Sequence, residues 1–341
     1  MIREAIARLL ERKDLTEKEA EEAVGEIMRG EATPSQIGGF LVALRMKGET
    51  ADEVTGSARA MRAASLKVHT SRKPLVDTCG TGGDGAGTFN ISTTVALVVA
   101  GAGVAVAKHG NRSVSSSCGS ADLLEELGVK VDLGPEAVGK CIDEVGIGFL
   151  FAPRYHPAMK HAAPIRKDLG VRTVFNILGP LTNPASAPMQ LVGVYSPDLT
   201  ELMARVLARL GATRAMVVHG AGGLDELSTS GPSRVTLLDR GQITTEYVDP
   251  VALGLSALSN NGIRGGTPED NARATREVLR GEKGPRRDIV LLNAAAMLVT
   301  CGKAADYAQG MAMAADSIDS VRAFKVLAEL ARFTQGAAKT S

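Results

Sequence analysis

From residue 75 onward, short apolar runs rich in β-branched residues alternate with segments of helical periodicity, and this alternation constrains the fold of the 341-residue chain most strongly. The predicted strands centre on residues 75–77, 104–106, 148–150, 191–194, 215–218 and 234–238. The predicted helices span 92–101, 120–127, 135–145, 198–210, 268–280 and 285–299. Such alternation is typical of a mainly parallel sheet flanked by helices. Residues 238–243 have the pattern of a hairpin, which predicts one antiparallel edge.

The first 65 residues contain no strand-like run and carry three helix-start signals, at Thr16, Thr33 and Thr50. Thr16 and Thr50 are each followed three residues later by Glu, as in a capping box, and Thr33 precedes a proline. We therefore expect an all-helical domain before the α/β region.

The helical domain is expected to cover residues 1–70. Residues 160–186 also lack strand character and contain three prolines, so we expect them to complete this domain. The larger α/β domain is then expected to consist of residues 71–159 and 187–341.

Composition excludes several classes of protein. The 39 Lys and Arg residues balance 38 Asp and Glu residues, and aromatic residues make up only 3%, so we expect no nucleic-acid partner. The longest apolar runs, 95–107 and 289–301, are too short to span a bilayer, and no signal peptide or membrane partner is expected. Four dispersed cysteines without a CxxC motif favour the cytoplasm and argue against structural zinc.

A glycine-rich segment follows the first predicted strand and ends at a predicted helix. Its five glycines between residues 80 and 87 let backbone N–H groups approach an anion, and the helix N-terminus adds positive potential. Side-chain donors follow at Thr88, Asn90, Ser92 and Thr93. The segment predicts a phosphate-binding loop. It fits neither a dinucleotide site, since the next strand leads to Lys108 instead of an acid, nor a Walker A motif, since Thr88 stands where Lys is required.

Two more segments lie at predicted strand ends. Residues 108–122 combine two cations, a histidine, an asparagine and five serines before a helix, which predicts a second anion site. Asp225 and Glu226 follow an apolar strand and a glycine turn, and Mg²⁺ is commonly held by one or two carboxylates plus substrate phosphates. In the basic segment 151–167, Arg166 is either a solvated cation or a partner for a substrate carboxylate. A substrate with separate phosphate and pyrophosphate groups would suit two anion-binding loops and a magnesium site.

The chain resembles the anthranilate phosphoribosyltransferase family over nearly its whole length. The shared motifs, in the family's order, are Gly80-Thr81-Gly82-Gly83-Asp84, Thr88-Phe89-Asn90-Ile91-Ser92-Thr93, Lys108-His109-Gly110-Asn111-Arg112, Gly119-Ser120-Ala121-Asp122, Phe175-Asn176-Ile177-Leu178-Gly179-Pro180-Leu181-Thr182-Asn183-Pro184 and Gly223-Leu224-Asp225-Glu226. Ser117 departs from the family, where many members have Lys, and removes one cation from the second loop.

The resemblance implies transfer of phosphoribosyl from 5-phosphoribosyl 1-pyrophosphate to the amine of anthranilate, the second step of tryptophan biosynthesis from chorismate. It also implies a small helical domain, a larger α/β domain, a fold shared with pyrimidine nucleoside phosphorylases, and a homodimer formed through the helical domain. Two Mg²⁺ ions per subunit are implied, held by Ser92, Asp225 and Glu226. Phosphoribosyl pyrophosphate would contact Gly80, Gly83, Asp84, Thr88, Asn90, Ser92, Thr93, Lys108, Ser116 and Ser120. Anthranilate would contact Gly80, His109, Asn111, Pro153, His156 and Arg166.

No general acid or base is evident in the sequence. An aromatic amine is already neutral at pH 7, so catalysis can rest on positioning and on neutralising the leaving pyrophosphate. A nucleoside phosphorylase of the same fold would need neither the Asp225–Glu226 pair nor Arg166. A nucleic-acid-binding relative is disfavoured by the balanced charge and the scarcity of aromatic residues.

Overall fold

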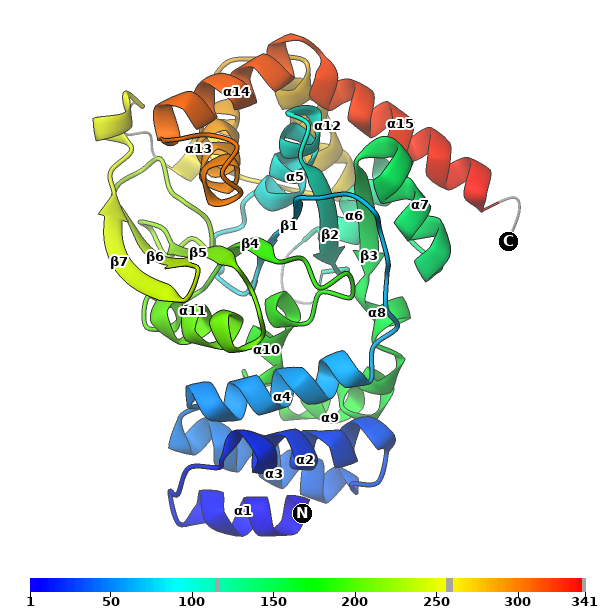
Figure 1. Ribbon diagram of the computed structural model, residues 1–341, viewed down its shortest axis with the longest axis vertical. Helices are drawn as coiled ribbons and strands as arrows, with labels where there is room; N and C mark the ends of the chain where they lie inside the picture. The colour runs from blue at the N-terminus through cyan, green and yellow to red at the C-terminus, as the bar shows by residue number, and fades with distance from the viewer. Residues whose placement is uncertain (114–116, 256–259, 339–341) are drawn as a thin grey trace.

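A seven-stranded sheet forms the centre of the larger part of the molecule (Figure 1). The computed structural model describes residues 1–113, 117–255 and 260–338. Its strands are β1 (Leu75–Gly80), β2 (Ala105–Gly110), β3 (Ile147–Phe151), β4 (Met189–Gly193), β5 (Arg214–His219), β6 (Ser233–Asp239) and β7 (Gln242–Val248). They lie in the order β3-β2-β1-β4-β5-β6-β7. The first five are parallel, whereas β6 and β7 are antiparallel, so the predicted parallel sheet and its antiparallel hairpin edge are confirmed.

Helices cover both faces of the sheet because side chains on a strand alternate between faces. On β5, Met216 and Val218 join one core, and Val217 joins the other. The first core contains α5 (Ile91–Gly101), α6 (Ser120–Glu126), α12 (Pro268–Leu279), α13 (Pro285–Thr300), α14 (Tyr307–Asp319) and α15 (Arg322–Ala337). The second contains α11 (Leu199–Arg209) and the N-terminal helices. A smaller cluster packs α7 (Pro135–Val145) against β2 and β3.

Four helices form the N-terminal part, at the bottom of Figure 1. They are α1 (Ile2–Leu10), α2 (Glu17–Arg29), α3 (Pro34–Lys47) and α4 (Ala51–Ala63). Capping boxes are present at Thr16 and Thr50, as predicted, and the predicted helix start at Thr33 also has one, with Gln36. These caps satisfy N–H groups that a helix leaves without partners at its start.

Short helices fill the segment between β3 and β4. They are α8 (Ala152–Tyr155), η1 (Pro157–His161), α9 (Ala163–Leu169), α10 (Phe175–Leu178) and η2 (Gly179–Leu181). η1 packs on α2, and α9 packs on α3, so this part of the chain lies against the N-terminal helices.

Helices α14 and α15 were not predicted from the sequence. Helix α15 carries buried residues at helical spacing, Ala323, Val326, Leu327 and Leu330, but it begins after Val321, which has a left-handed conformation and provides no side-chain cap. The remaining short helices are η3 (Val251–Leu253) and η4 (Asn260–Ile263). No helix among the described residues is long and apolar enough to cross a membrane.

Candidate active site

Most of the predicted site residues lie at the carboxyl edge of the parallel strands. The chain places β2 and β3 on one side of β1, and then β4 and β5 on the other. The strand order therefore reverses between β1 and β4, which is where open α/β sheets bind ligands. The loops that follow β1, β2 and β5 meet at this edge.

The loop after β1 is open to a ligand. Gly82, Gly83, Gly85 and Gly87 all have positive φ, between 62° and 75°, a conformation that residues with a side chain rarely adopt. A Cβ atom built on Gly82, Gly85 or Gly87 would meet no atom within 4 Å. The loop therefore exposes backbone to a region free of other protein atoms, as a phosphate-binding loop requires.

The loop after β5 crosses the ends of β1 and β4. A Cβ atom on Gly80, Gly193 or Gly220 would overlap atoms of Asp225 or Glu226. The Gly82 N–H donates to the Asp225 carboxylate over 2.8 Å. Glycines at three strand ends thus make room for the two adjacent acids, a signal that was present in the sequence but was not used to predict their position.

Asp84, Asp225 and Glu226 form an acidic cluster. Burial, and then the Asp84 carboxylate, raise the pKa of Asp225 to about 7. Burial first, and Asp225 next, raise the pKa of Glu226 well above its ordinary value, although Lys108 opposes this and the Ser92 backbone donates to Glu226. Asp84 Oδ2 is buried and accepts no hydrogen bond. Close, desolvated carboxylates disfavour full ionisation, so the cluster is electrostatically suited to a cation.

No three acidic, histidine or cysteine side chains in the described parts of the chain are placed to hold a metal ion by themselves. Mg²⁺ usually takes one or two carboxylates and completes its shell with water and substrate phosphates.

Lys108 lies buried on β2 beside this cluster. Its Nζ donates to the Thr78 carbonyl over 2.5 Å and to Ser92 Oγ over 3.4 Å. The ammonium group therefore faces the first turn of α5, where the predicted phosphate-binding residues Ser92 and Thr93 lie.

Asp77 on β1 supports this edge, a role that was not predicted from the sequence. Its buried carboxylate accepts the His109 N–H over 3.2 Å and the Asn183 side-chain amide over 2.7 Å. Asn183 also donates to the Ala107 carbonyl. Burial raises the pKa of Asp77. An acid within an otherwise apolar strand was the available signal.

His109 and His156 form a buried pair with ring centroids 5.1 Å apart. Burial, followed by the neighbouring His156, lowers the pKa of His109 to about 3. Burial, followed by Lys67, lowers the pKa of His156 to about 4. Nε2 of each ring is buried without a hydrogen-bond partner. Both imidazoles are therefore neutral at pH 7 and present a free ring nitrogen.

The second predicted anion loop follows β2. Ser120 and Asn111 exchange two hydrogen bonds of 3.1–3.2 Å across its base. The N-cap of helix α6 is Gly119, and the Asp122 carboxylate accepts the Gly119 N–H. Ser117 Oγ donates to the Gly266 carbonyl over 2.7 Å. Ser116 lies outside the described residues.

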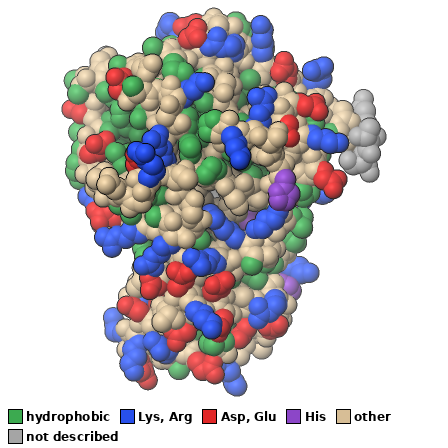
Figure 2. Space-filling model, in the orientation of Figure 1, with side chains coloured by type: hydrophobic (Ala, Val, Ile, Leu, Met, Phe, Trp, Pro, Cys, Tyr) green, Lys and Arg blue, Asp and Glu red, His purple; other side chains and the backbone are tan. Residues whose placement is uncertain are grey.

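Arg166 and Pro153 are not brought into contact with the carboxylates. Arg166 is half-buried, its guanidinium lies 5.4 Å over the Phe175 ring, and it makes no ion pair within the described residues. Burial lowers its pKa. Pro153 is exposed at the start of α8. Figure 2 shows Lys and Arg side chains along the narrow region where the helical and α/β parts meet.

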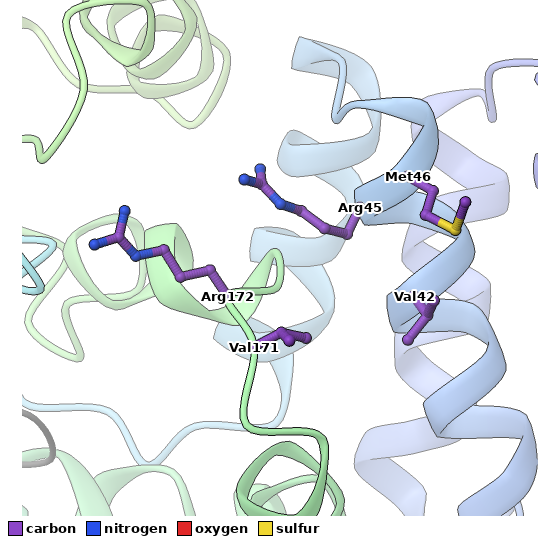
Figure 3. A pocket seen from close by; sticks show the side chains of 5 residues that line it. All are labelled: Val42, Arg45, Met46, Val171 and Arg172. Atoms are coloured by element: carbon purple, nitrogen blue, oxygen red, sulfur yellow. The ribbon is translucent and has the colours of Figure 1, made fainter.

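Arg172 is another cation in this region. It donates to the Gly83 carbonyl and lies 4.1 Å over the Tyr195 ring. A cavity of about 530 Å³, lined by Val42, Arg45, Met46, Val171 and Arg172, lies where α3 faces this segment (Figure 3). The cavity does not contain any residue predicted for the site.

Buried polar atoms without partners concentrate at the predicted site. Among the described residues, seven such side-chain atoms occur, and four belong to Asp84, Thr93, His109 and His156. Buried polar atoms are nearly always hydrogen-bonded, so each exception requires an explanation. A polar ligand at this sheet edge would satisfy them.

Two family models match the chain. The α/β domain of a glycosyl transferase family matches residues 72–324, and the helical bundle domain of a glycosyl transferase family matches residues 3–65. Anthranilate phosphoribosyltransferase from Symbiobacterium thermophilum is 57% identical over 96% of both chains. The enzyme of that name from Moorella thermoacetica is 59% identical over 94% of both.

Solved structures agree with these matches. Anthranilate phosphoribosyltransferase from Thermus thermophilus is 47% identical, with a TM-score of 0.92 over 97% of this chain and 99% of that one. The Saccharomyces cerevisiae enzyme in complex with PRPP (phosphoribosyl pyrophosphate) and Mg is 29% identical, with a TM-score of 0.90 over 98% of each chain. The same yeast enzyme in complex with 4-fluoroanthranilate gives a TM-score of 0.89.

Proposed function

The chain belongs to the anthranilate phosphoribosyltransferase family, and we propose from this membership that it transfers the phosphoribosyl group of PRPP to the amine of anthranilate. The products are N-(5-phosphoribosyl)anthranilate and pyrophosphate, in the second step of tryptophan biosynthesis from chorismate. The observation that carries the proposal is the concentration of buried, unpartnered polar atoms where the glycine loop, the acidic cluster and the two histidines meet.

PRPP is proposed to lie along the carboxyl edge of β1 and β2. The open glycine loop supplies backbone N–H groups, and Lys108 supplies positive charge beside the first turn of α5. The proposed contacts are Gly80, Gly83, Asp84, Thr88, Asn90, Ser92, Thr93, Lys108, Ser116 and Ser120.

The acidic cluster fits Mg²⁺. It consists of hard oxygen donors, one of them unpartnered, and their mutual repulsion is relieved by a cation. Without a cation, Asp84, Asp225 and Glu226 would repel the pyrophosphate group. We propose two ions per subunit, held by Ser92, Asp225 and Glu226. When bound, Mg²⁺ supplies positive charge that stabilises the leaving pyrophosphate.

The reaction needs positioning more than proton transfer. The neutral amine nitrogen forms a bond to the ribose C1 while the bond from C1 to the pyrophosphate oxygen breaks, and the resulting ammonium nitrogen then gives a proton to water or to the released pyrophosphate. Positive charge develops at C1, and negative charge develops on the pyrophosphate. The glycine-loop N–H groups and Lys108 are placed to stabilise the latter before the reaction begins.

Anthranilate is proposed to lie between the neutral histidines and the helical part. His109 and His156 offer apolar ring faces and free Nε2 atoms, which suit an aromatic amine. Arg166 is a half-buried cation without an ion pair in the described residues, which suits a carboxylate. The full proposed set is Gly80, His109, Asn111, Pro153, His156 and Arg166.

A homodimer through the helical part is proposed as the working form, with residues 160–186 belonging to that part. Leu10 and Met46 are each 73% exposed, and Val171 is 55% exposed, on α1, on α3 and after α9. Large exposed apolar side chains on neighbouring elements often mark partner surfaces. Sedimentation should give a dimer at micromolar concentration that Met46→Glu weakens; a monomeric wild-type chain would contradict the proposal.

The proposed site of action is the cytoplasm. Within the described residues no disulfide joins the cysteines, three of which are buried, and this supports a reducing compartment.

The proposed activity is tested by product identification. The purified chain is incubated with anthranilate, PRPP and Mg²⁺, and the product is identified by chromatography and mass. Phosphoribosyl-anthranilate is expected. Phosphorolysis of thymidine or uridine, without phosphoribosyl-anthranilate, would instead assign the chain to the nucleoside phosphorylase reaction.

A further inference from the structure

Asn271 is not among the residues discussed for the site, but its side chain forms hydrogen bonds with residues next to the glycine loop. It stands one turn into α12 and is 1% exposed. Its Oδ1 accepts the Gly266 N–H over 2.8 Å, and its Nδ2 donates to Asn90 Oδ1 over 2.9 Å. Asn90 is the residue that ends the glycine loop and precedes α5.

These contacts continue into a closed ring that joins the two phosphate-binding loops. Asn90 Nδ2 donates to the Cys118 carbonyl over 3.1 Å, and Cys118 belongs to the second loop. Ser117, the residue before Cys118, donates through Oγ to the Gly266 carbonyl over 2.7 Å. Because the Gly266 N–H donates to Asn271, this hydrogen bond closes the ring. The ring therefore spans the glycine loop, the second loop and the turn before α12.

The turn at residues 263–266 is itself bound to the glycine loop. The Phe89 N–H donates to the Ile263 carbonyl over 3.0 Å, and the Gly265 N–H donates to the Gly87 carbonyl over 2.9 Å. Thr88 and Arg264 form an antiparallel bridge between these two hydrogen bonds. Any shift of this turn must therefore move the end of the glycine loop.

The direction of every hydrogen bond through the two asparagines is fixed by backbone groups at the ends. The Gly266 N–H can only donate, so Asn271 must present its oxygen there and its NH₂ to Asn90. The Cys118 carbonyl can only accept, so Asn90 must present its NH₂ there and its oxygen to Asn271. Only a side chain with one acceptor and one donor in this geometry completes the ring at position 271.

We propose that Asn271 is a positioning residue that sets the spacing of the two phosphate-binding loops and thereby the affinity for PRPP. The proposal rests on the proposed function, because it assumes that both loops bind the same PRPP molecule. Asn271 touches no substrate in this proposal; it acts through Asn90, Gly266 and the second loop.

Two variants of Asn271 separate hydrogen bonding from packing. Asn271→Leu keeps the side-chain size and removes both hydrogen bonds. Asn271→Asp keeps the acceptor for the Gly266 N–H but places a carboxylate oxygen against Asn90 Oδ1. Rotating the Asn90 amide by 180° would not relieve this contact, because Asn90 Oδ1 would then face the Cys118 carbonyl oxygen.

Thr275→Val is the matched control. Thr275 lies one turn further along α12, is fully buried, and loses a 3.1 Å hydrogen bond with Thr94 of α5, while Thr94 Oγ1 keeps its own 3.0 Å hydrogen bond to the Asn90 carbonyl. A purely structural effect of losing a buried hydrogen bond on α12 should appear in this variant as well.

The measurements are the PRPP dissociation constant by calorimetry with Mg²⁺, the two Michaelis constants, and Tm. Both Asn271 variants should weaken PRPP binding about tenfold or more, as expected for a lost buried hydrogen bond. Their Michaelis constant for anthranilate at saturating PRPP should stay within about twofold of the wild type. Thr275→Val should lower Tm by a similar amount and leave PRPP binding unchanged.

Equal PRPP affinity in Asn271→Leu and Thr275→Val would overturn the proposal and make Asn271 a structural residue only. If Asn271→Leu does not fold, Ser117→Ala at an exposed position still tests the ring, since it removes the Ser117–Gly266 link and should weaken PRPP binding severalfold. Unchanged affinity in Ser117→Ala and Asn271→Asp would also overturn it. A wild-type chain that fails to bind PRPP would instead refute the proposed function, independently of any variant.

Discussion

Replacing Arg166 with Ala should weaken anthranilate binding selectively. The guanidinium is half-buried, lies over the Phe175 ring at 5.4 Å, and has no ion pair in the described residues. The Arg166→Ala variant therefore leaves no orphaned carboxylate, and its cost in stability is limited to the contact with Phe175, about 0.5–1 kcal/mol. The effect on substrate binding can then be measured in a folded protein.

The expected loss follows from the charge-assisted hydrogen bond that Arg166 would make to the anthranilate carboxylate. Such bonds contribute about 1.5–3 kcal/mol, which corresponds to an increase of roughly ten- to a hundredfold in the Michaelis constant for anthranilate. The Michaelis constant for PRPP should change much less. Arg166→Lys should give an intermediate value, because Lys keeps the charge but cannot form two parallel hydrogen bonds.

The matched control is Lys167→Ala. Lys167 is the next residue on α9, carries the same charge and is exposed, so its removal should change neither Michaelis constant. An equal increase in both Michaelis constants for Arg166→Ala would indicate a disturbed contact between the helical and α/β parts. No change in either would show that Arg166 is simply a partly solvated cation.

Three further predictions concern the phosphate and metal region and the histidines. Asp225→Asn should abolish most turnover but raise Tm, measured at pH 8 without Mg²⁺. Burial raises the pKa of Asp225 to about 7, so at pH 8 the buried carboxylate is ionised and destabilises the folded state, whereas Asn stays neutral. A lower Tm would refute this electrostatic reasoning. Gly83→Val should abolish PRPP binding seen by calorimetry while circular dichroism stays unchanged, whereas Gly241→Val, at φ 89° in the distant β6–β7 hairpin, should retain binding. The folded-state pKa values of about 3 for His109 and about 4 for His156 lie below the unfolded value of 6.5, so stability is fully present above pH 6.5 and falls as pH drops toward 4. The urea midpoint should follow this course, with a shallower fall in His156→Asn; a midpoint that is flat from pH 6.5 to 4.5 would contradict the burial of both rings.

Most of the strands and helices could be predicted from the sequence, because the parallel strands are short and apolar and are followed by clear turns. The glycine loop was identified because it follows an apolar strand, and the Asp225–Glu226 pair because it follows an apolar strand and a glycine turn. The individual site residues were assigned from the family resemblance. Their contacts with the substrates remain predictions.

Contacts between distant segments could not be predicted. Asp77 joins Asn183 across 106 residues, and Asn271 joins Asn90 across 181. A single sequence contains no pattern that relates residues so far apart, because only the sheet topology brings the segments together. Helix α14 was missed because its residues are mostly Ala, Met and Gly, which give a weak apolar period, although Asp306 caps its start. Helix α15 was missed because it begins after Val321, which provides no side-chain cap.

The most direct test of the proposed transfer is the stoichiometry of the reaction under continuous observation. Anthranilate fluorescence and pyrophosphate release are followed together in the purified chain with PRPP and Mg²⁺, before and after the metal is removed with EDTA. Fluorescence should fall in step with pyrophosphate release, one molecule for one, and both should stop when Mg²⁺ is removed. Pyrophosphate release without consumption of anthranilate, or an unchanged rate in excess EDTA, would contradict the assignment of this sheet edge as a magnesium-dependent phosphoribosyl transfer site.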